Sequence, residues 1–556
     1  MHTKVWTSTR CSLSGKKCEY RTRRSAKPAV HSRLRLFEAR LGNLESHLVP
    51  EENFAPDPSK AEHEIYKLDD EYTDRWSHLD FRKIFTSDLL GKSISTTKIQ
   101  ITPEQKHFPG EELQQKLYDL YFEKVHRSTP IIHRSNFFRS LDNDTTSAPT
   151  TALKYAMWAT AALVSPEHQH VAERLYALGR KHAEDLERNS SLKEIAPSHA
   201  QCWYLLALYE GSQAYFGRAW MSVGRCGRLV QMLSLHRLDS PLEEKHALWQ
   251  EGSIELEEGW RVFWGAYLGD RLASTLSGHP HMIRDEDICT NLPSSEQSFE
   301  LGIEEMGISL KQAYHTNGVA YLSPFAWSIF TTATLGRTLS HIRAFEHDIP
   351  TDINGNYWKS HRDVDTSISL TFLNLPTRLR EFGADEDMQV VMSQFNLHVS
   401  VILLQQVAVS KVVKQKMNPL VRQNSFQRCL MSALQIKDII YCVKDLTIFS
   451  GMMWIPFCVY VAAGVFIEDL TSQDPSPTSA ADLGLLLIAL KEINAHQSGI
   501  NFFARRLESD ISRTGVACHI PTDLRGMAGF TTTQQNSIPA PPSNTPYCDT
   551  SQYRYS

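Results

Sequence analysis

The sequence predicts an all-α fold in which a large multi-helix body is preceded by a short basic segment. Apolar residues in the 556-residue chain recur at steps of three and four over many segments, which is the period of a helix. Sustained alternation of apolar and polar residues, the signature of a half-buried strand, is hard to find. The chain is 42% hydrophobic and 10% aromatic, so packed helices have enough apolar material to bury a large core.

The clearest helical periods lie in residues 216–233 and 256–276. Both segments place apolar side chains, many of them aromatic in the second, on one face at three- and four-residue steps. Further helices are expected at 112–126, 151–164, 170–188, 199–210, 318–345, 388–415, 426–444 and 480–508. Loops are expected where Gly, Pro, Ser, Asn and Asp gather, at 189–198, 277–301, 347–362 and 471–479.

Residues 446–467 form an almost uncharged run that is long enough to span a bilayer. Pro456 lies inside the run, and the small and polar residues at its start are typical of a turn. No cluster of Lys or Arg flanks either end closely, as an orientation signal requires. We therefore expect a buried core helix from Met453 to Leu470 and no membrane association.

Charge is distributed unevenly along the chain. Residues 1–37 contain ten Lys or Arg and one acidic residue, Glu19, so this segment carries +9. The whole chain carries −5, and the other 519 residues therefore carry −14. The basic segment at residues 1–37, which we call the head, is thus followed by an acidic remainder. This distribution indicates that the head binds a polyanion. The ten scattered Cys fit a reducing compartment, and the N-terminus lacks the apolar core of a secretory signal.

These patterns divide the chain into five regions. We expect a basic segment at 1–30, a short heptad helix at 31–49, a polar linker at 50–105, the helical body at 106–515 and a disordered tail at 516–556. The body is therefore the region expected to hold the large core.

Cys11 and Cys18 are separated by six residues in the sequence CSLSGKKCEY. Two thiolates at this spacing, with Gly15 permitting a tight loop, fit half of a metal site. A structural zinc ion needs four ligands. From the spacing alone, the two residues are either part of a zinc site or two free cysteines in a basic tail.

Residues 34–48 follow a heptad pattern. In a parallel dimer, Arg33 and Arg40 at the g positions face Glu38 and Glu45 at the e positions, so both pairs join opposite charges. The apolar a and d positions are Leu34, Phe37, Leu41, Leu44 and Leu48. Two heptads fit either a short coiled coil that makes a homodimer or an amphipathic helix docked on the body.

The head and the heptads together resemble the DNA-binding module of the fungal zinc binuclear cluster (Zn2Cys6) transcription factors. Cys11 and Cys18 look like the last C-x6-C of its six cysteines, followed by the family's basic linker and coiled coil. The first four cysteines are missing, and Ser8 stands where the fourth is expected. The resemblance implies DNA contacts from Lys16, Lys17, Arg21, Arg23, Arg24 and Lys27.

We therefore expect a truncated module that binds zinc incompletely. It would read DNA sequence-specifically only if the missing cysteines were restored, because the family presents its base-reading side chains on the two-zinc cluster.

Three blocks of the body resemble, in order, the fungal-specific transcription factor domain of the same family. They are LYDLYFEKVHRSTPIIHRSNFF at 117–138, GRAWMSVGRCGRLVQMLSLHR at 217–237, and an aromatic-rich helix with an acidic loop at 259–293. The resemblance covers most of 110–300 and, more loosely, 318–510. It implies a nuclear regulator of RNA polymerase II genes, often of a metabolic or secondary-metabolite cluster, that works with the transcription machinery. The basic run KKCEYRTRR fits nuclear import.

Arg271 follows Asp270 near the end of the aromatic-rich helix and is expected to be half buried. An unpaired buried guanidinium is costly, so we expect a structural ion pair with Asp270, Asp285 or Asp287 that fixes the following loop. An effector-anion site at Arg271 is the alternative.

Two other functions fit parts of the sequence. A regulator without its own DNA reader would act by pairing with other factors through residues 31–49 and the helical body. An all-α terpene-synthase-like enzyme would need two metal motifs, but DDEYTD at 69–74 lies in the linker and 143–151 has Thr151 where a Glu is needed. We therefore expect no enzymatic activity.

Overall fold

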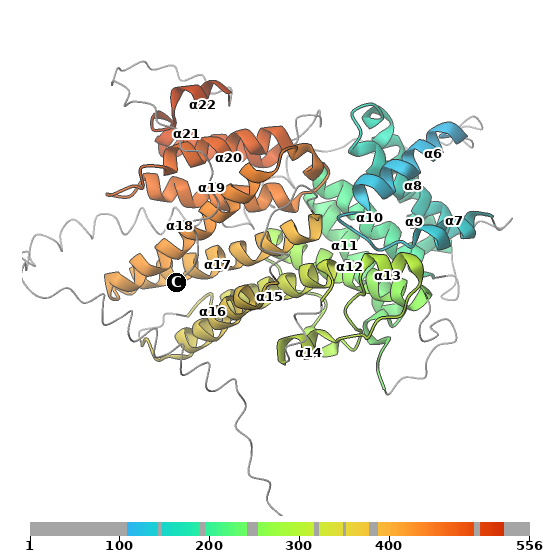
Figure 1. The fold of residues 1–556 in the computed structure, drawn as a ribbon, viewed down its shortest axis with the longest axis horizontal. Coiled ribbons are helices and arrows are strands. Elements are labelled where there is room, and N and C mark those ends of the chain that lie inside the picture. Colours follow the sequence, from blue (N-terminus) through green and yellow to red (C-terminus); the bar gives the residue numbers. More distant parts are fainter. Residues whose placement is uncertain are drawn as a thin grey trace, which may run out of the picture. The chain divides into compact units, whose positions relative to one another are not determined.

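The computed structural model describes residues 108–142, 147–189, 195–241, 254–315, 322–348, 352–376, 387–493 and 501–527 (Figure 1). The regular elements in these ranges are helices, and one isolated antiparallel bridge joins Asn291 and Ser309. The prediction of an all-α fold is confirmed for this part of the chain.

The described ranges of the body contain a series of helices. The α-helices are α6 Glu111–Leu120, α7 Arg134–Asp142, α8 Ala148–Leu163, α9 Gln169–Asn189, α10 Pro197–Ser212, α11 Phe216–Met232, α12 Ile254–Ser277, α13 Glu296–Leu301, α14 Leu310–His315, α15 Pro324–Ala344, α16 Asn356–Asn374, α17 Met388–Lys414, α18 Pro419–Cys442, α19 Trp454–Leu470, α20 Ser479–Ile493, α21 Phe502–Thr514 and α22 Thr522–Met527. A π-helix, η3 Tyr121–Val125, continues α6, and the 3-10 turns are η5 Leu235–Arg237, η6 Asp285–Asp287, η9 Leu446–Phe449 and η10 Val516–Cys518.

Polar caps followed by proline set the starts of several helices. Ser323 accepts a hydrogen bond from the backbone N–H of Ala326 at 3.1 Å, and Pro324 is the first residue of α15. Asn418 and Pro419 start α18 in the same way. Proline is tolerated in the first turn because its missing N–H would have no helical partner there. The cap and the proline together explain why α15 begins at Pro324.

The expected loop at 347–362 is wrong, because α16 begins inside it. Tyr357, His361, Val364 and Ile368 are buried at steps of four, three and four residues, which is the period of a helix. The loop-forming residues end at Gly355, the N-cap of α16. Polar residues such as Lys359, Arg362 and Asp363 lie between the buried positions and conceal this period in the sequence.

The boundary of the body at residue 515 is also wrong. Val516 and Ile520 are each 2% exposed and belong to the core, and α22 follows them. The described structure therefore reaches Met527, and the tail beyond that residue lies outside the described ranges.

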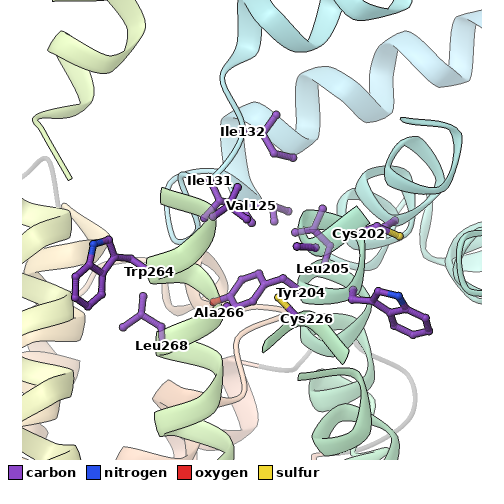
Figure 2. Close-up of a cluster of buried hydrophobic side chains, with 14 of the residues drawn as sticks. Val125, Ile131, Ile132, Cys202, Tyr204, Leu205, Cys226, Trp264, Ala266 and Leu268 are labelled. Carbon is purple, nitrogen blue, oxygen red and sulfur yellow. The ribbon is translucent and has the colours of Figure 1, made fainter. Parts of the chain in front are cut away.

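The first core is the cluster of buried side chains that extends from Leu117 on α6 to Ala333 on α15 and also includes Leu375 and Val390. It is rich in aromatic rings, and Trp158, Trp203, Trp264 and Trp327 are among the largest fully buried side chains. Figure 2 shows part of this cluster, where Tyr204 on α10 lies between its own helix and α12. The aromatic content of α8, α10, α12 and α15 is thus used to pack these helices against one another.

The second core is the cluster of mostly aliphatic side chains from α17 to α21, with the ends of α12 and α15. Leu276 and Leu339 belong to it, whereas Leu268 and Ala333 on the same two helices belong to the first core. Each of the helices α12 and α15 is therefore buried in the first core along one part and in the second core along another.

The apolar run at 446–467 is a core helix, as expected. It contains η9 and most of α19, and almost every residue of α19 is buried in the second core. Among the described helices, α17 is long and apolar enough to cross a membrane by length and composition alone. Since 83% of that apolar window is buried inside the protein, α17 has the surroundings of a core helix.

Candidate functional site

The residues predicted to bind zinc, contact DNA and form the dimer lie outside the described residues. They are Cys11, Cys18, Lys16, Lys17, Arg21, Arg23, Arg24, Lys27, Leu34, Phe37, Leu41, Leu44 and Leu48. Two thiolates fall short of the four ligands of a structural zinc ion, so these residues alone do not fit a complete site. Within the described ranges, no group of three or more His, Cys, Asp or Glu side chains is placed to hold a metal ion.

Arg271, near the C-terminal end of α12, is buried and paired with two carboxylates. Its Nη1 donates to Asp270 Oδ2 at 2.6 Å, and its Nη2 donates to Asp285 Oδ1 at 2.5 Å. The Asp270 carboxylate also accepts hydrogen bonds from the backbone N–H groups of Met282 and Ile283, which lie in the loop after the helix. Two carboxylates balance the guanidinium charge, which leaves little attraction for the effector anion that was considered as the alternative.

Asp287 takes no part in this ion pair, and that part of the prediction is wrong. Asp287 is exposed, and its Oδ2 lies 4.0 Å from Arg284 Nε. In a 3-10 turn successive side chains are rotated by roughly 120°, so Asp285 and Asp287 of η6 point in different directions. Asp285 is held toward α12 by a second bond, because the Tyr267 hydroxyl donates to it at 2.9 Å.

Arg271 also packs against α15. A Cβ on Gly336 would lie 2.9 Å from the Cδ atom of Arg271, so the guanidinium stem occupies the space that a side chain would take. His281 lies close by, and burial, together with the charges of Arg271 and Arg343, lowers its pKa to about 3. His281 is therefore neutral at physiological pH and adds no charge to this junction.

Arg261 forms a second buried ion pair, which the sequence reasoning missed. Its side chain is fully buried, and it donates to Glu257 at 2.8 Å, to Glu296 at 2.6 Å and to the Ser294 carbonyl at 3.1 Å. Burial by itself would raise the pKa of Glu296, but the hydrogen bond from His126 and the charge of Arg261 lower it to about 2. The signal in the sequence is an Arg directly after Trp260 in the aromatic run WRVFW.

A cavity of about 640 Å³ lies where the two cores meet. Its walls come from η3 and from α8, α10, α11, α12 and α17, together with the connection between α18 and α19. Cavities of this size bind small molecules in many proteins. The apolar part of the lining includes Leu163, Leu208, Phe216, Leu272, Leu276 and Met392.

The π-helix η3 supplies one edge of the cavity. Tyr121, Phe122 and Val125 are buried in the first core, whereas Glu123 and Lys124 are exposed and line the cavity. π-Helical turns are rare and occur often at functional sites, because the extra residue in the turn reorients side chains. The arrangement makes this cavity the candidate functional site of the body.

Residues 118–319 match the family described as the fungal specific transcription factor domain. The range begins in α6 and ends after α14, so it contains α12 and both buried arginines. The matched range therefore contains the part of the chain in which the three sequence blocks lie, apart from Leu117.

The similar proteins carry names of the same kind. The chain is 30% identical over 370 residues to a pigment biosynthesis transcriptional activator of Monascus ruber, which covers 64% of this chain and 65% of that protein. It is 30% identical over 261 residues to a citrinin biosynthesis transcriptional activator of Monascus purpureus, and the aligned region covers 47% of this chain and 45% of that protein. It is 26% identical over 443 residues to an asperfuranone cluster transcription factor of Emericella nidulans, and the aligned region covers 72% of this chain and 64% of that protein.

These comparisons support a fungal transcription factor. The family and the relatives have the names of transcriptional regulators and not of enzymes, which confirms the expectation that the chain is not an enzyme. The chain spans less than two thirds of the length of each of these relatives. No solved structure matches the chain.

Proposed function

We propose that the chain is a nuclear transcription factor that activates RNA polymerase II genes of a secondary-metabolite biosynthesis cluster. The observation that carries the proposal is the match of residues 118–319 to the fungal specific transcription factor domain. Its relatives are named as activators of pigment and citrinin biosynthesis and as a regulator of an asperfuranone cluster. We infer activation, and not repression, from the names of these relatives.

A recruitment assay tests this activity without relying on the head. The full chain is fused to a heterologous DNA-binding domain and expressed in a fungal host with a reporter gene behind the matching site. We expect several-fold more reporter transcript than with the DNA-binding domain alone. A fusion that carries Arg284→Ala, at an exposed position, should activate the reporter as the wild-type fusion does and shows that a surface substitution alone does not change the transcript level. A reporter level equal to that of the DNA-binding domain alone, with the fusion present in the nucleus, would contradict the proposal.

The head is proposed to contact DNA through phosphates. Residues 1–37 carry +9 and neutralise several phosphates, so the 556-residue chain should bind DNA weakly, with little sequence preference and a steep salt dependence. Replacing Lys16, Lys17, Arg21, Arg23, Arg24 and Lys27 with Gln should reduce the salt dependence, whereas Lys311→Gln on α14 should not. A form with all six cysteines should bind zinc and prefer sites that contain CGG, as the family resemblance implies.

A competition gel shift at two salt concentrations, with zinc measured by elemental analysis, tests this account of the head. Two zinc ions bound to the 556-residue chain would contradict it. Discrimination of a cognate site from random DNA by more than about tenfold, or ~1.4 kcal/mol, would contradict it as well.

The second candidate function is a regulator that reaches DNA through a partner. The heptad pattern of residues 34–48, with opposite charges at the g and e positions, favours it. Leu41→Pro removes a helix hydrogen bond and an a-layer contact, so we expect the full chain to change from dimer to monomer in sedimentation. Gly42→Ala, at the outward b position, is the control and should stay dimeric. The same mass for wild type and Leu41→Pro would show that these heptads do not mediate dimerisation.

A further inference from the structure

We propose that the cavity between the two cores binds a mainly apolar small molecule that carries a hydrogen-bonding oxygen. We further infer that this molecule ties the first core to the second. The inference rests on the proposed function in one respect only, that the body is a regulatory domain for which such a ligand would be the effector. The binding itself follows from the lining of the cavity.

The walls of the cavity favour an apolar ligand. Leucine and phenylalanine side chains from α8, α10, α11 and α12 form one side. Four methionines, Met388, Met392, Met452 and Met453, line it from α17 and from the connection before α19. Methionine is flexible and polarisable, so it adapts to flat or irregular ligands and makes favourable contacts with aromatic rings.

One buried hydroxyl gives the ligand a polar anchor. Ser328 on α15 lines the cavity and is 1% exposed, and its Oγ has no hydrogen-bond partner among the described residues. The surrounding polar groups already satisfy one another, because Asn396 donates to Thr332 Oγ1 at 2.8 Å and accepts from Trp454 Nε1 at 2.8 Å. A buried hydroxyl without a partner costs free energy that a ligand oxygen would recover.

The charges at the edge of the cavity do not favour a polyanion. Lys124, Arg127 and Lys444 are exposed there, but Glu123 and Asp445 lie among them. A phosphate-rich ligand would meet repulsion from the two carboxylates as well as attraction from the three cations. We therefore expect a neutral or weakly charged ligand and no binding of nucleotides.

The residues around the cavity belong to both cores, so an occupant would contact both. Tyr204, Leu163 and Leu268 are first-core residues, and Leu276 and Met392 are second-core residues.

The connection before α19 also approaches the first core closely. Gly451, at φ +81°, has Val164 Cγ1 2.7 Å from the position of a Cβ, and Gly211 on α10 has Met453 Cε at 3.3 Å. A ligand held here is expected to stabilise the junction and to raise the melting temperature of the folded chain.

Nile red, a neutral fluorescent ring system with a carbonyl oxygen, is a suitable probe for the full chain. We expect saturable binding at one site per chain and a higher melting temperature with the dye present. Ala273→Phe, on the α12 wall, should weaken binding at least tenfold by filling the cavity. The matched control is Ala177→Phe at a half-buried position of α9 that does not line the cavity, and it should bind as the wild type does.

Two further probes test the chemistry. Ser328→Ala should weaken Nile red about fivefold, as the loss of one ordinary hydrogen bond does, and should leave the binding of pyrene, which has no polar atom, unchanged. ATP should not compete with Nile red. Competition by ATP, or an equal effect of Ser328→Ala on Nile red and pyrene, would overturn the assigned ligand class.

A second cavity-filling variant is needed in case the first does not fold. If Ala273→Phe does not fold, Leu208→Trp on the α10 wall replaces it. Absence of saturable Nile red binding, or wild-type affinity in a folded cavity-filling variant, would overturn the proposal. Because no DNA or reporter enters the titration, either result would leave the recruitment assay to decide the proposed function independently.

Discussion

The two cores of the body differ in how deeply they bury ion-paired cations. In the first core, the side chains of Arg261 and Arg271 are 0% and 3% exposed, and each is paired with carboxylates. Among the described ion pairs near the second core, every cationic side chain is at least 20% exposed, as Lys437 is beside Asp482. The family-matched half therefore holds its central helix by directional bonds to buried guanidinium groups. The second core is mainly apolar, and the buried charges of α19, α20 and α21 are the carboxylates of Asp469, Asp482 and Asp510.

The largest effect should come from Arg261→Ala. This change leaves Glu257 buried without its cation and removes bonds to Glu296 and to a backbone carbonyl, so we expect a loss of about 3–5 kcal/mol in the free energy of unfolding. Calorimetry of the full chain measures it. Arg284→Ala, whose side chain is 70% exposed, is the control and should change little. Equal melting temperatures for the two variants would break the comparison.

Arg271→Ala should cost about 2–5 kcal/mol for the same reason. The two acids of η6 give a matched pair for this site. Asp285→Ala should destabilise the protein because Asp285 holds Arg271 and Tyr267, whereas Asp287→Ala should stay within about 0.5 kcal/mol of the wild type. An unchanged thermal midpoint for Arg271→Ala would show that the loop after α12 is not fastened by this pair.

In the second core, Leu487→Ala should cost about 2–5 kcal/mol through lost burial and the cavity that it leaves. Leu420→Ala on α18 is the control, because Leu420 is 61% exposed. Since no charge is involved, the cost of Leu487→Ala should be the same at low and high salt. A marked salt dependence of this cost would contradict the view that the second core is held by apolar packing.

The smallest expected effect is on the pH dependence of the free energy of unfolding. Burial lowers the pKa of His398 on α17 from 6.5 to about 4. The unfolded chain takes up this proton below pH 6.5 and the folded chain only near pH 4, so stability is lost as the pH falls through that window. His398→Phe, beside Phe372, should remove about 1–2 kcal/mol of the loss between pH 7 and pH 5. The same pH profile as wild type in calorimetry would show that His398 is already protonated when folded. His170→Phe, at an exposed position, is the control.

The sequence predicts the helices well where their apolar faces are dense. The segment expected at 256–276 forms α12 at Ile254–Ser277, and 388–415 forms α17 at Met388–Lys414. It fails for α16, where polar residues stand between Tyr357 and Ile368, and it does not give the start of α15, which the Ser323 cap and Pro324 set. Capping and tertiary burial decide these boundaries, and neither is visible in the apolar period alone.

The site is less predictable than the helices. The rule that a buried guanidinium needs a partner points to acids near Arg271, but only the geometry of η6 selects Asp285 over Asp287. The cavity has no sequence signature, because its lining extends from Glu123 to Trp454 and each helix gives it only a few residues. Such a space depends on how the helices of the two cores meet, which the pattern of one helix does not contain.

The central claim, that the chain activates a biosynthesis cluster, is tested most directly by sequencing RNA from a strain in which its gene is deleted and from the same strain complemented with the wild-type gene. We predict that transcripts of one contiguous set of biosynthetic genes fall severalfold on deletion and return on complementation. Unchanged transcripts of every such gene set, under conditions in which the wild-type strain produces the protein, would contradict the account.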